Sequence, residues 1–381
     1  MRFWLAVLFI TTIIFSCKQK KAKPEAKVVL LKGEFGFRKL SEKEKEIYGD
    51  KVTAFYNKLL KPNRFNGGFI VAKNGEIVYE NYEGLSNFST KESITANTPL
   101  QIASISKTFT SALVLRLWEQ GKLSLEDSLQ KFFPSFPYHN ISIKLLLTHR
   151  SGLPKYEYFM DTAWHEPRMA DNNDMLQFMI SKQPELYNKP NKSYHYCNTN
   201  YALLALVIEK ITGQTFPQYI KDSLFLPLGM KNSYVFSTKD TLNYVPSYMY
   251  NNAPYRLENI DCIYGDKNVY CTPRELLLWD KALYEGSFVS KKTLEMAFTP
   301  YSNERKSVHN YGMGWHLFIN NNDKVVYHNG WWHGNNTAFA RLVNDTATII
   351  ALGNRYNRAV YWSWKVGTIF SGKNKEQELE E

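Results

Sequence analysis

The chain has 381 residues, of which 44% are hydrophobic and 22% are charged, and its formal net charge is +11. This composition excludes a disordered chain and supplies enough apolar residues for one large domain or two closely joined ones. Much of the excess positive charge lies between residues 18 and 32, and no nucleic-acid-binding motif accompanies it, so we expect no nucleic acid as a partner.

The chain begins with MRFWLAVLFITTIIFSC, in which Arg2 precedes an apolar run that ends at Ser16-Cys17. This layout is typical of a secretory signal, and the run is too short for a stable membrane-spanning helix. A small residue followed by cysteine resembles the signal of a bacterial lipoprotein, which implies lipidation of Cys17. An ordinary signal peptide, or a short anchor with an incidental cysteine, is the alternative.

These features predict four segments along the chain. They are a lipoprotein-type signal peptide (1–17), a basic tether (18–46), a folded domain (47–371) and a polar tail (372–381). No later stretch is long and apolar enough to cross a membrane. We therefore expect an exported protein, periplasmic or in the cell envelope, that a lipid anchor holds to a membrane.

The first elements of the folded domain are a helix and a hairpin. Residues 48–60 have the pattern of an amphipathic helix. The stretch NGGFIVAKNGEIVYENYEG follows, with two β-rich runs joined at Asn74-Gly75, which is a strong hairpin signal. From Thr110 the apolar residues recur at helical spacing, and Gly121 is expected to end that helix.

The rest of the chain is helical first and β-rich later. Residues 123–220 are helical and rich in loops, with several prolines as breakers. Three strand-like runs follow late in the chain (KVVYHNG, NTAFARLV and TATIIALGN), and residues 358–370 form a closing helix. We predict an α/β (α+β) fold, in which an antiparallel sheet built from both chain ends is flanked by helices. A mostly helical subdomain, about residues 123–245, is inserted.

Ser104 and Lys107 lie one turn apart at the start of the helix that contains Thr110. A serine hydroxyl is a weak nucleophile until a neighbouring group takes its proton, and a lysine can do so once burial lowers its pKa. Amides of the first helical turn also favour the negative charge that develops on an acyl oxygen. By itself, however, S-x-x-K occurs often by chance, and the lysine could simply extend from the helix start to solvent.

Two further short motifs follow in the sequence. Tyr196-Cys197-Asn198 precedes an apolar helix, where a phenol could relay a proton and an amide could hold the substrate. His328-Asn329-Gly330 ends a strand-like run, and its glycine would let a substrate approach the backbone closely. Each motif alone is read more simply as a buried tyrosine, a helix cap or a strand histidine.

Taken in this order, the three motifs resemble the active-site motifs of the serine β-lactamases and penicillin-binding proteins. They are most similar to the branch of class C β-lactamases and low-molecular-weight DD-peptidases, in which a tyrosine opens the second motif. LLLTHRSGLP, GDKNVYCTPRELLLWDKAL and YGMGWHL are similar to structural signatures of the same family. The resemblance covers about residues 66–370.

The resemblance implies a serine hydrolase that forms an acyl-enzyme. It implies Ser104 as nucleophile, Lys107 as base and Tyr196 as proton relay, with Asn198, His328, Gly330 and Trp331 binding the substrate. The oxyanion hole would be the backbone amides of Ser104 and Trp331. The substrate would be a small molecule or related to peptidoglycan, and we expect a monomer without cofactor or metal.

The sequence departs from the family pattern in three places. The third motif is often Lys-Thr-Gly, so His328 replaces a fixed positive charge with a titratable imidazole. Cys197 replaces a common serine, which we interpret as a packing variant. Trp331 and Trp332 crowd the expected oxyanion position, where they would line an apolar acyl pocket or form a hydrophobic lid. These departures favour short neutral esters or amides over β-lactams that carry a carboxylate.

Other readings of the sequence stay open at this point. Within enzymes, the motifs do not separate a β-lactamase, a D-Ala-D-Ala carboxypeptidase, a D-aminopeptidase and an esterase. A metal-dependent hydrolase would use late histidines, but no H-E-x-x-H helix accompanies them. A non-catalytic, penicillin-recognising module would need a signalling membrane segment, for which we see no sequence. The four cysteines fit neither a zinc site nor a disulfide framework (Cys17, Cys197, Cys262 and Cys271).

Overall fold

The computed structural model describes residues 30–31, 35–321 and 323–370. The predicted signal peptide with Cys17, most of the tether and the polar tail lie outside the described residues. Where the chain is described, no helix is both long and apolar enough to span a bilayer.

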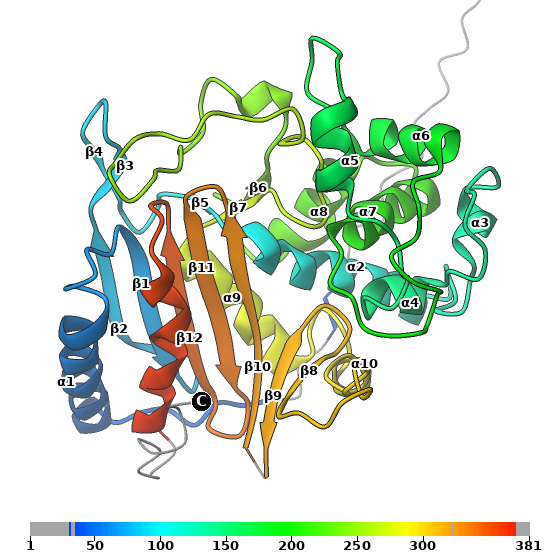
Figure 1. Cartoon of the computed structure of the whole chain (residues 1–381). Coiled ribbons are helices and arrows are strands. Elements are labelled where there is room, and N and C mark those ends of the chain that lie inside the picture. The colour runs from blue at the N-terminus through cyan, green and yellow to red at the C-terminus, as the bar shows by residue number, and fades with distance from the viewer. Residues whose placement is uncertain (1–29, 32–34, 322, 371–381) are drawn as a thin grey trace, which may run out of the picture.

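The central feature is a seven-stranded antiparallel sheet with the strand order β2-β1-β12-β11-β10-β9-β8 (Figure 1). Its strands are β1 (Gly67–Lys73), β2 (Glu76–Glu83), β8 (His309–Tyr311), β9 (His316–Asn320), β10 (Asp323–Trp332), β11 (Asn335–Leu342) and β12 (Ala347–Gly353). Strand β1 pairs with β12 from Gly67↔Gly353 to Lys73↔Ala347, so an early and a late segment of the chain are neighbours in the sheet. The predicted antiparallel sheet from both chain ends is therefore confirmed.

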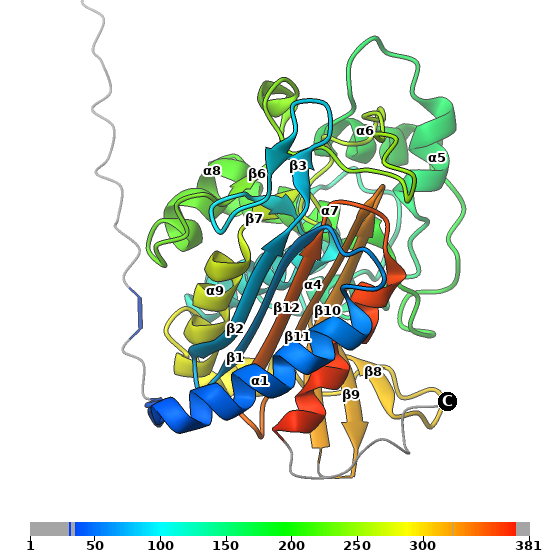
Figure 2. The same ribbon diagram turned by 90° about the vertical axis from the view of Figure 1, so that its left-hand side faces the viewer.

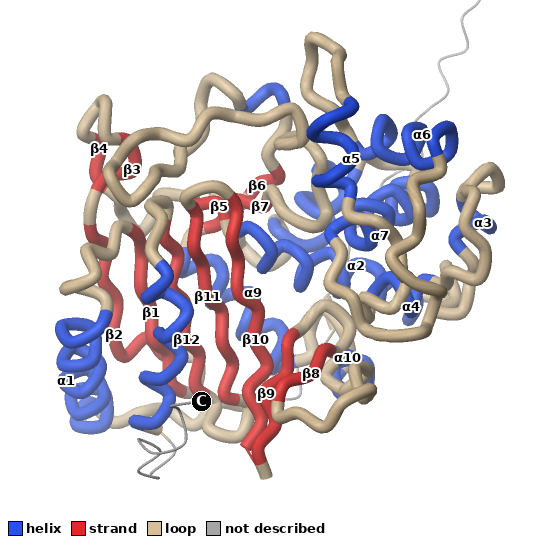
Figure 3. Tube along the Cα trace, viewed as in Figure 1, coloured by secondary structure: helices blue, strands red, loops and turns tan. Residues whose placement is uncertain are grey.

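Helices cover both faces of this sheet (Figure 2). On one face lie α1 (Glu42–Leu59) and the closing 3₁₀ helix η4 (Arg358–Ile369), and on the other lie α2 (Ser106–Glu119), α9 (Pro273–Glu285) and α10 (Lys291–Ala297). A mostly helical unit follows α2 and stands beside the sheet, as Figure 3 shows. It contains α3 (Leu129–Phe132), α4 (Ile143–Leu147), α5 (Tyr156–Ala163), α6 (Asn172–Lys182), α7 (Asn198–Thr212), α8 (Phe216–Ile220) and the π-helical turn η2 (Lys221–Phe225).

The alternation of side chains along β1 explains why the sheet is covered twice. Phe69 and Val71 belong to the core beneath α1 and η4, whereas Ile70 and Ala72 belong to the core on the α2 side. Because neighbouring side chains in a strand point to opposite faces, a continuous apolar run is stable only between two layers. This arrangement makes the middle of the sheet a rigid platform for the elements at its end.

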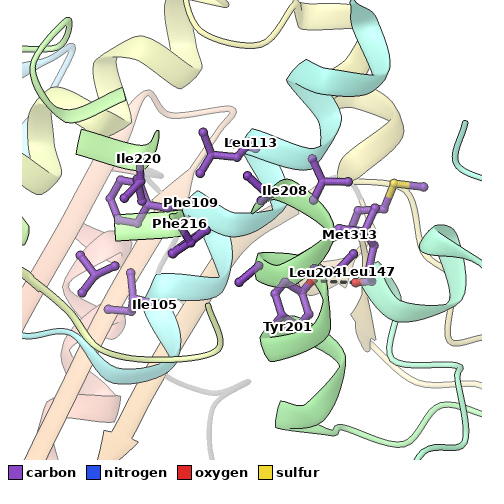
Figure 4. Close-up of a cluster of buried hydrophobic side chains, with 14 of the residues drawn as sticks. Ile105, Phe109, Leu113, Leu147, Tyr201, Leu204, Ile208, Phe216, Ile220 and Met313 are labelled. Atoms are coloured by element: carbon purple, nitrogen blue, oxygen red, sulfur yellow. Dashed lines mark hydrogen bonds between the residues drawn. The ribbon is translucent and has the colours of Figure 1, made fainter. Parts of the chain in front are cut away.

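Figure 4 shows how α2 is held in the helical unit. Phe109 and Leu113 on α2 belong to the same buried cluster as Leu204 and Ile208 on α7. The phenol of Tyr201 donates a hydrogen bond to the carbonyl of Leu147 at 2.8 Å and so ties α7 to α4. Tight packing on several sides fixes the position of α2, which carries the candidate nucleophile at its start.

One helix begins earlier than predicted, and local chemistry explains why. Helix α1 begins at Glu42, within the segment expected to be tether, because Ser41 and Glu44 form a capping box that satisfies the first amides. Helix α2 begins at Ser106, between Ser104 and Lys107, which were predicted to lie at its start. Its end is as predicted, since Gly121 has a left-handed φ of 68°.

Small strands that the sequence did not predict complete the fold around the site. β5 (Leu100–Gln101), β7 (Val269–Cys271) and β6 (Tyr234–Val235) form a three-stranded sheet, and β3 (Leu85–Asn87) pairs with β4 (Glu92–Ser93). The pairing of β5 with β7 continues as a hydrogen bond from the Ile102 amide to the Val269 carbonyl at 2.9 Å. It brings the loop that precedes β7 against the start of α2.

Candidate active site

Ser104 lies in a short 3₁₀ turn, η1 (Ala103–Ile105), that leads directly into α2. Ala103 has a φ of 47°, a left-handed conformation that is uncommon for a residue with a Cβ. Such conformations persist only where the surroundings enforce them, and they concentrate at functional sites. The turn leaves the Ser104 side chain half-buried at the start of a packed helix.

Lys107 is completely buried, and its ammonium group contacts the candidate nucleophile. Its Nζ donates hydrogen bonds to Ser104 Oγ at 3.0 Å and to the Asp266 carbonyl at 2.8 Å. Burial lowers the pKa of Lys107 to about 8, although the charges of Asp266 and Glu157 oppose the shift. A minor fraction of Lys107 is therefore a neutral amine at neutral pH, and this fraction grows as the pH rises through about 8, where the amine is placed to accept the proton of Ser104.

Tyr196 forms the opposite wall of this contact. Its ring centre lies 5.0 Å from the Lys107 Nζ, and Ser104 is close enough to lower the pKa of its phenol. Burial raises the pKa of Tyr196 far above its usual value, so the phenol stays protonated. The ring of His149 packs against Tyr196 at 4.4 Å and its Nδ1 accepts the Cys197 amide, which fixes the second motif. Tyr196 can therefore relay a proton but does not act as a resting phenolate.

Asn198 is the first residue of α7, and its amide faces an unexpected partner. Its Nδ2 donates to Glu157 Oε1 at 2.7 Å rather than to a group of the first motif. Burial raises the pKa of Glu157, and the nearby charge of Asp266 adds to the effect. Sequence reasoning did not identify Glu157 as a site residue.

Gly330 brings β10 against the segment that carries the nucleophile. A Cβ at this position would lie 2.2 Å from Thr337 Oγ1 and 2.4 Å from the Ile102 carbonyl oxygen, distances that no side chain tolerates. The glycine thus permits a close approach of two backbones, as strand glycines often do. The approach carries the adjacent Trp331 to the end of the sheet that faces Ser104.

The two tryptophans differ in their surroundings. The side chain of Trp331 is 65% exposed. That of Trp332 is anchored, because its Nε1 donates to Asp261 Oδ1 at 2.7 Å and the Lys267 ammonium lies 4.7 Å from its ring centre. Trp332 is therefore a fixed part of the strand end, while Trp331 presents apolar surface to the solvent.

His328 carries no positive charge in this environment. It is 1% exposed, and burial, with the charges of His316 and Lys107 adding to the effect, holds its pKa well below the usual value. Its Nδ1 lies 2.7 Å from the Asn329 carbonyl, which can only accept, so Nδ1 carries the proton. Its Nε2 is then the acceptor for the Tyr311 hydroxyl at 3.4 Å. The ring of His316 lies 4.9 Å away, and burial lowers its pKa to about 4.

The late histidines do not converge on a single point. His316 and His328 are neighbours, but His309 packs on Phe318 and the imidazole of His333 contacts Asp261. Within the described part of the chain, no group of three or more histidine, cysteine or acidic side chains is arranged to hold a metal ion.

The cysteines of the described segments are free and buried (Cys197, Cys262 and Cys271). Burial raises the pKa of Cys197 to about 12, and its Sγ lies 3.4 Å from the Leu153 carbonyl. The thiol therefore stays protonated and packs against the backbone.

A buried polar network behind the site also escaped the sequence analysis. Lys267 Nζ donates to the Tyr156 hydroxyl at 2.7 Å, and this hydroxyl donates to Asp266 Oδ2 at 2.9 Å. Asp266 thus holds Tyr156 with its side chain and Lys107 with its carbonyl. The only signal in the sequence was the family-like stretch that begins at Gly265, which does not assign a role to any single residue.

Comparisons with known proteins identify relatives of the chain. A family model described as Beta-lactamase matches residues 53–360. Penicillin-binding protein 4* of Bacillus subtilis is 32% identical over 328 residues, which cover 81% of this chain and 72% of that protein. Two further curated relatives are covered over only 63% and 54% of their length.

Solved structures show the same fold. The octameric penicillin-binding protein homologue of Pyrococcus abyssi has a TM-score of 0.74 at 25% identity, covering 86% of this chain and 78% of that one. The D-amino acid amidase of Ochrobactrum anthropi has a TM-score of 0.72 at 21% identity, covering 85% and 99%.

Proposed function

Because this chain belongs to the Beta-lactamase family of serine hydrolases, we propose that it hydrolyses small esters, amides or D-amino-acid peptides through an acyl-enzyme on Ser104. One observation carries the assignment of the nucleophile. The Nζ of a completely buried Lys107, with a pKa of about 8, lies 3.0 Å from Ser104 Oγ. Burial of a lysine costs free energy because its ammonium group loses hydration. A role in taking the proton of Ser104 explains why the lysine is nevertheless buried here.

In the proposed reaction, the neutral amine of Lys107 takes the proton of Ser104 as Oγ attacks the carbonyl carbon. The backbone amides of Ser104 and Trp331 receive the negative charge of the tetrahedral intermediate. The Tyr196 phenol relays the proton to the leaving group, which departs and leaves an ester on Ser104. Water then attacks this ester through the same groups and releases the acid.

The alternatives are a true β-lactamase and a D-Ala-D-Ala carboxypeptidase, and a turnover screen separates them. Nitrocefin, p-nitrophenyl esters and D-amino-acid peptides should be tested on the purified protein, with Ser104→Ala as the blank. Relatives named penicillin-binding protein support the alternatives, while the neighbour named D-amino acid amidase supports an uncharged leaving side. The uncharged His328 of the third motif favours substrates without a carboxylate at that position, as in the proposed function.

We predict that p-nitrophenyl butyrate is hydrolysed with a higher kcat/KM than nitrocefin. A carboxylate in a partly dry cleft gains about 1.5–3 kcal/mol from a charged hydrogen bond, and neutral His328 does not offer one. His328→Lys should narrow the ratio of the two kcat/KM values by restoring a cation at the third motif.

The matched control is His328→Gln, which changes the side chain without adding a charge, and thermal melting should verify that both variants fold. A higher kcat/KM for nitrocefin in the native protein would restore the β-lactamase reading. A ratio that His328→Lys leaves unchanged would place this side chain outside the reach of the substrate.

We also propose that the protein is exported and lipid-anchored through Cys17, acting as a monomer in the cell envelope. The apolar run that ends at Ser16-Cys17 supports this location. Cys17→Ser should abolish metabolic labelling with a palmitate analogue and release processed protein from the membrane fraction, because each buried methylene contributes about 0.8 kcal/mol. Mature protein with an unmodified Cys17 would contradict the proposal.

A further inference from the structure

Three buried oxygen atoms of the site have no hydrogen-bond partner in the described part of the chain, and they are Oε2 of Glu157, Oδ1 of Asn198 and Oδ1 of Asp266. Glu157 and Asn198 supply a neighbouring pair of these atoms. A 2.7 Å hydrogen bond from Asn198 Nδ2 to Glu157 Oε1 joins the two side chains, so their unpartnered oxygens are close neighbours. Both atoms are acceptors when Glu157 is ionised, and buried acceptors without a donor are costly.

The donors around this pair are engaged elsewhere. Lys107 Nζ donates to Ser104 and to the Asp266 carbonyl. Lys267 Nζ donates to the Tyr156 hydroxyl and to the carbonyls of Ile260 and Ile263. Neither ammonium hydrogen-bonds to the two oxygens, so a ligand with its own N–H or O–H groups would satisfy them, and a carboxylate partner favours a ligand with positive charge.

The pair lies next to the reacting groups. Asn198 is two residues from Tyr196, whose ring centre lies 5.0 Å from the Lys107 Nζ. The charge of Glu157 acts on both Lys107 and Tyr196. His316 and His328 lie on the other side of Tyr196 and carry no charge, so the third motif offers the substrate no cation.

We propose that Glu157 and Asn198 bind a primary ammonium group carried by the acyl part of the substrate, as in an ester or amide of an amino acid with a free amino group. This inference rests on the proposed function and names its substrate class. An ammonium group has three N–H donors, enough for Glu157 Oε2 and Asn198 Oδ1 together. Its charge offsets that of the carboxylate, which no side-chain cation neutralises by a hydrogen bond here.

The test compares two substrates that differ only by this group, alanine p-nitroanilide and propionyl p-nitroanilide, with the alanine compound in both D and L forms. The readout is the ratio of their kcat/KM values on the same protein sample, so any general loss of activity cancels. The native protein should prefer one alanine form over the propionyl compound. Glu157→Gln keeps the shape but removes the charge, and it should lower the ratio about 10- to 100-fold.

The matched control is Glu166→Gln, which removes an exposed carboxylate close in the sequence and should keep the native ratio. Equal ratios in the native protein and Glu157→Gln, or a native preference for the propionyl compound, would overturn the inference. In that case p-nitrophenyl butyrate hydrolysis that depends on Ser104 would still uphold the proposed function. If no ester or amide is hydrolysed in a Ser104-dependent way, the proposed function itself fails.

Discussion

Replacement of Ser104 by alanine should abolish both hydrolysis and covalent labelling. The native protein, treated with a fluorophosphonate probe and digested, should carry the added mass on the peptide that contains Ser104. The variant should not label, and its kcat should fall on the order of 10⁶-fold, the loss that follows removal of the nucleophile in another serine hydrolase. The physical reason is that no other described hydroxyl receives a hydrogen bond from the buried Lys107 amine.

The control for this experiment is Ser89→Ala, which removes an exposed hydroxyl in the turn between β3 and β4. It should label and turn over like the native protein. Mass added to a peptide without Ser104, or labelling that survives in Ser104→Ala, would show that the nucleophile lies elsewhere.

Replacement of Lys107 by arginine should be almost as damaging, with a loss of about 10²–10⁴-fold in kcat, as expected when a positioned base is removed. A guanidinium keeps its proton at any working pH, so it cannot accept the proton of Ser104. In the native protein the reactive form is the neutral amine, which forms as the pH rises through the pKa of about 8. The kcat/KM value should therefore increase with pH across that range, and this increase should be absent in Lys107→Arg.

Lys122→Arg is the matched control, because Lys122 is an exposed lysine just beyond the end of α2. Its rate and its pH profile should equal those of the native protein. Near-normal turnover by Lys107→Arg would mean that Lys107 has a structural role, and a profile centred near the ordinary lysine pKa would mean that burial does not tune it.

Local sequence patterns were sufficient to predict several parts of the fold. The Asn74-Gly75 pair predicted the hairpin of β1 and β2, and both residues have the left-handed φ that such a turn requires (51° and 69°). The antiparallel sheet followed from strand patterns at both chain ends. The early start of α1 was missed because Ser41 and Glu44 act through hydrogen bonds, and periodicity of apolar residues does not record them.

Only part of the site could be predicted from the sequence, because some of its contacts are local and others depend on the packed fold. Ser104 and Lys107 are one helical turn apart, so their contact is local and their spacing predicts it. Glu157 and Asp266 approach the site through α5 and the loop before β7, and only the packed fold brings them there. The sequence predicted a titratable imidazole at His328, but the burial that lowers its pKa and its bond to Tyr311 depend on tertiary packing.

The pairing of β1 with β12 affects how the protein folds during its synthesis. The β1–β2 hairpin is synthesised early and β12 is among the last segments. The edge of β1 that pairs with β12 therefore stays unpaired until most of the chain has been synthesised. Contacts between such distant segments form slowly. The strand containing Gly330, which reaches Ile102 beside the nucleophile, is also a late product. A chain released before β10 is synthesised therefore contains Ser104 but lacks the strand that packs beside it. We expect such a fragment to be inactive.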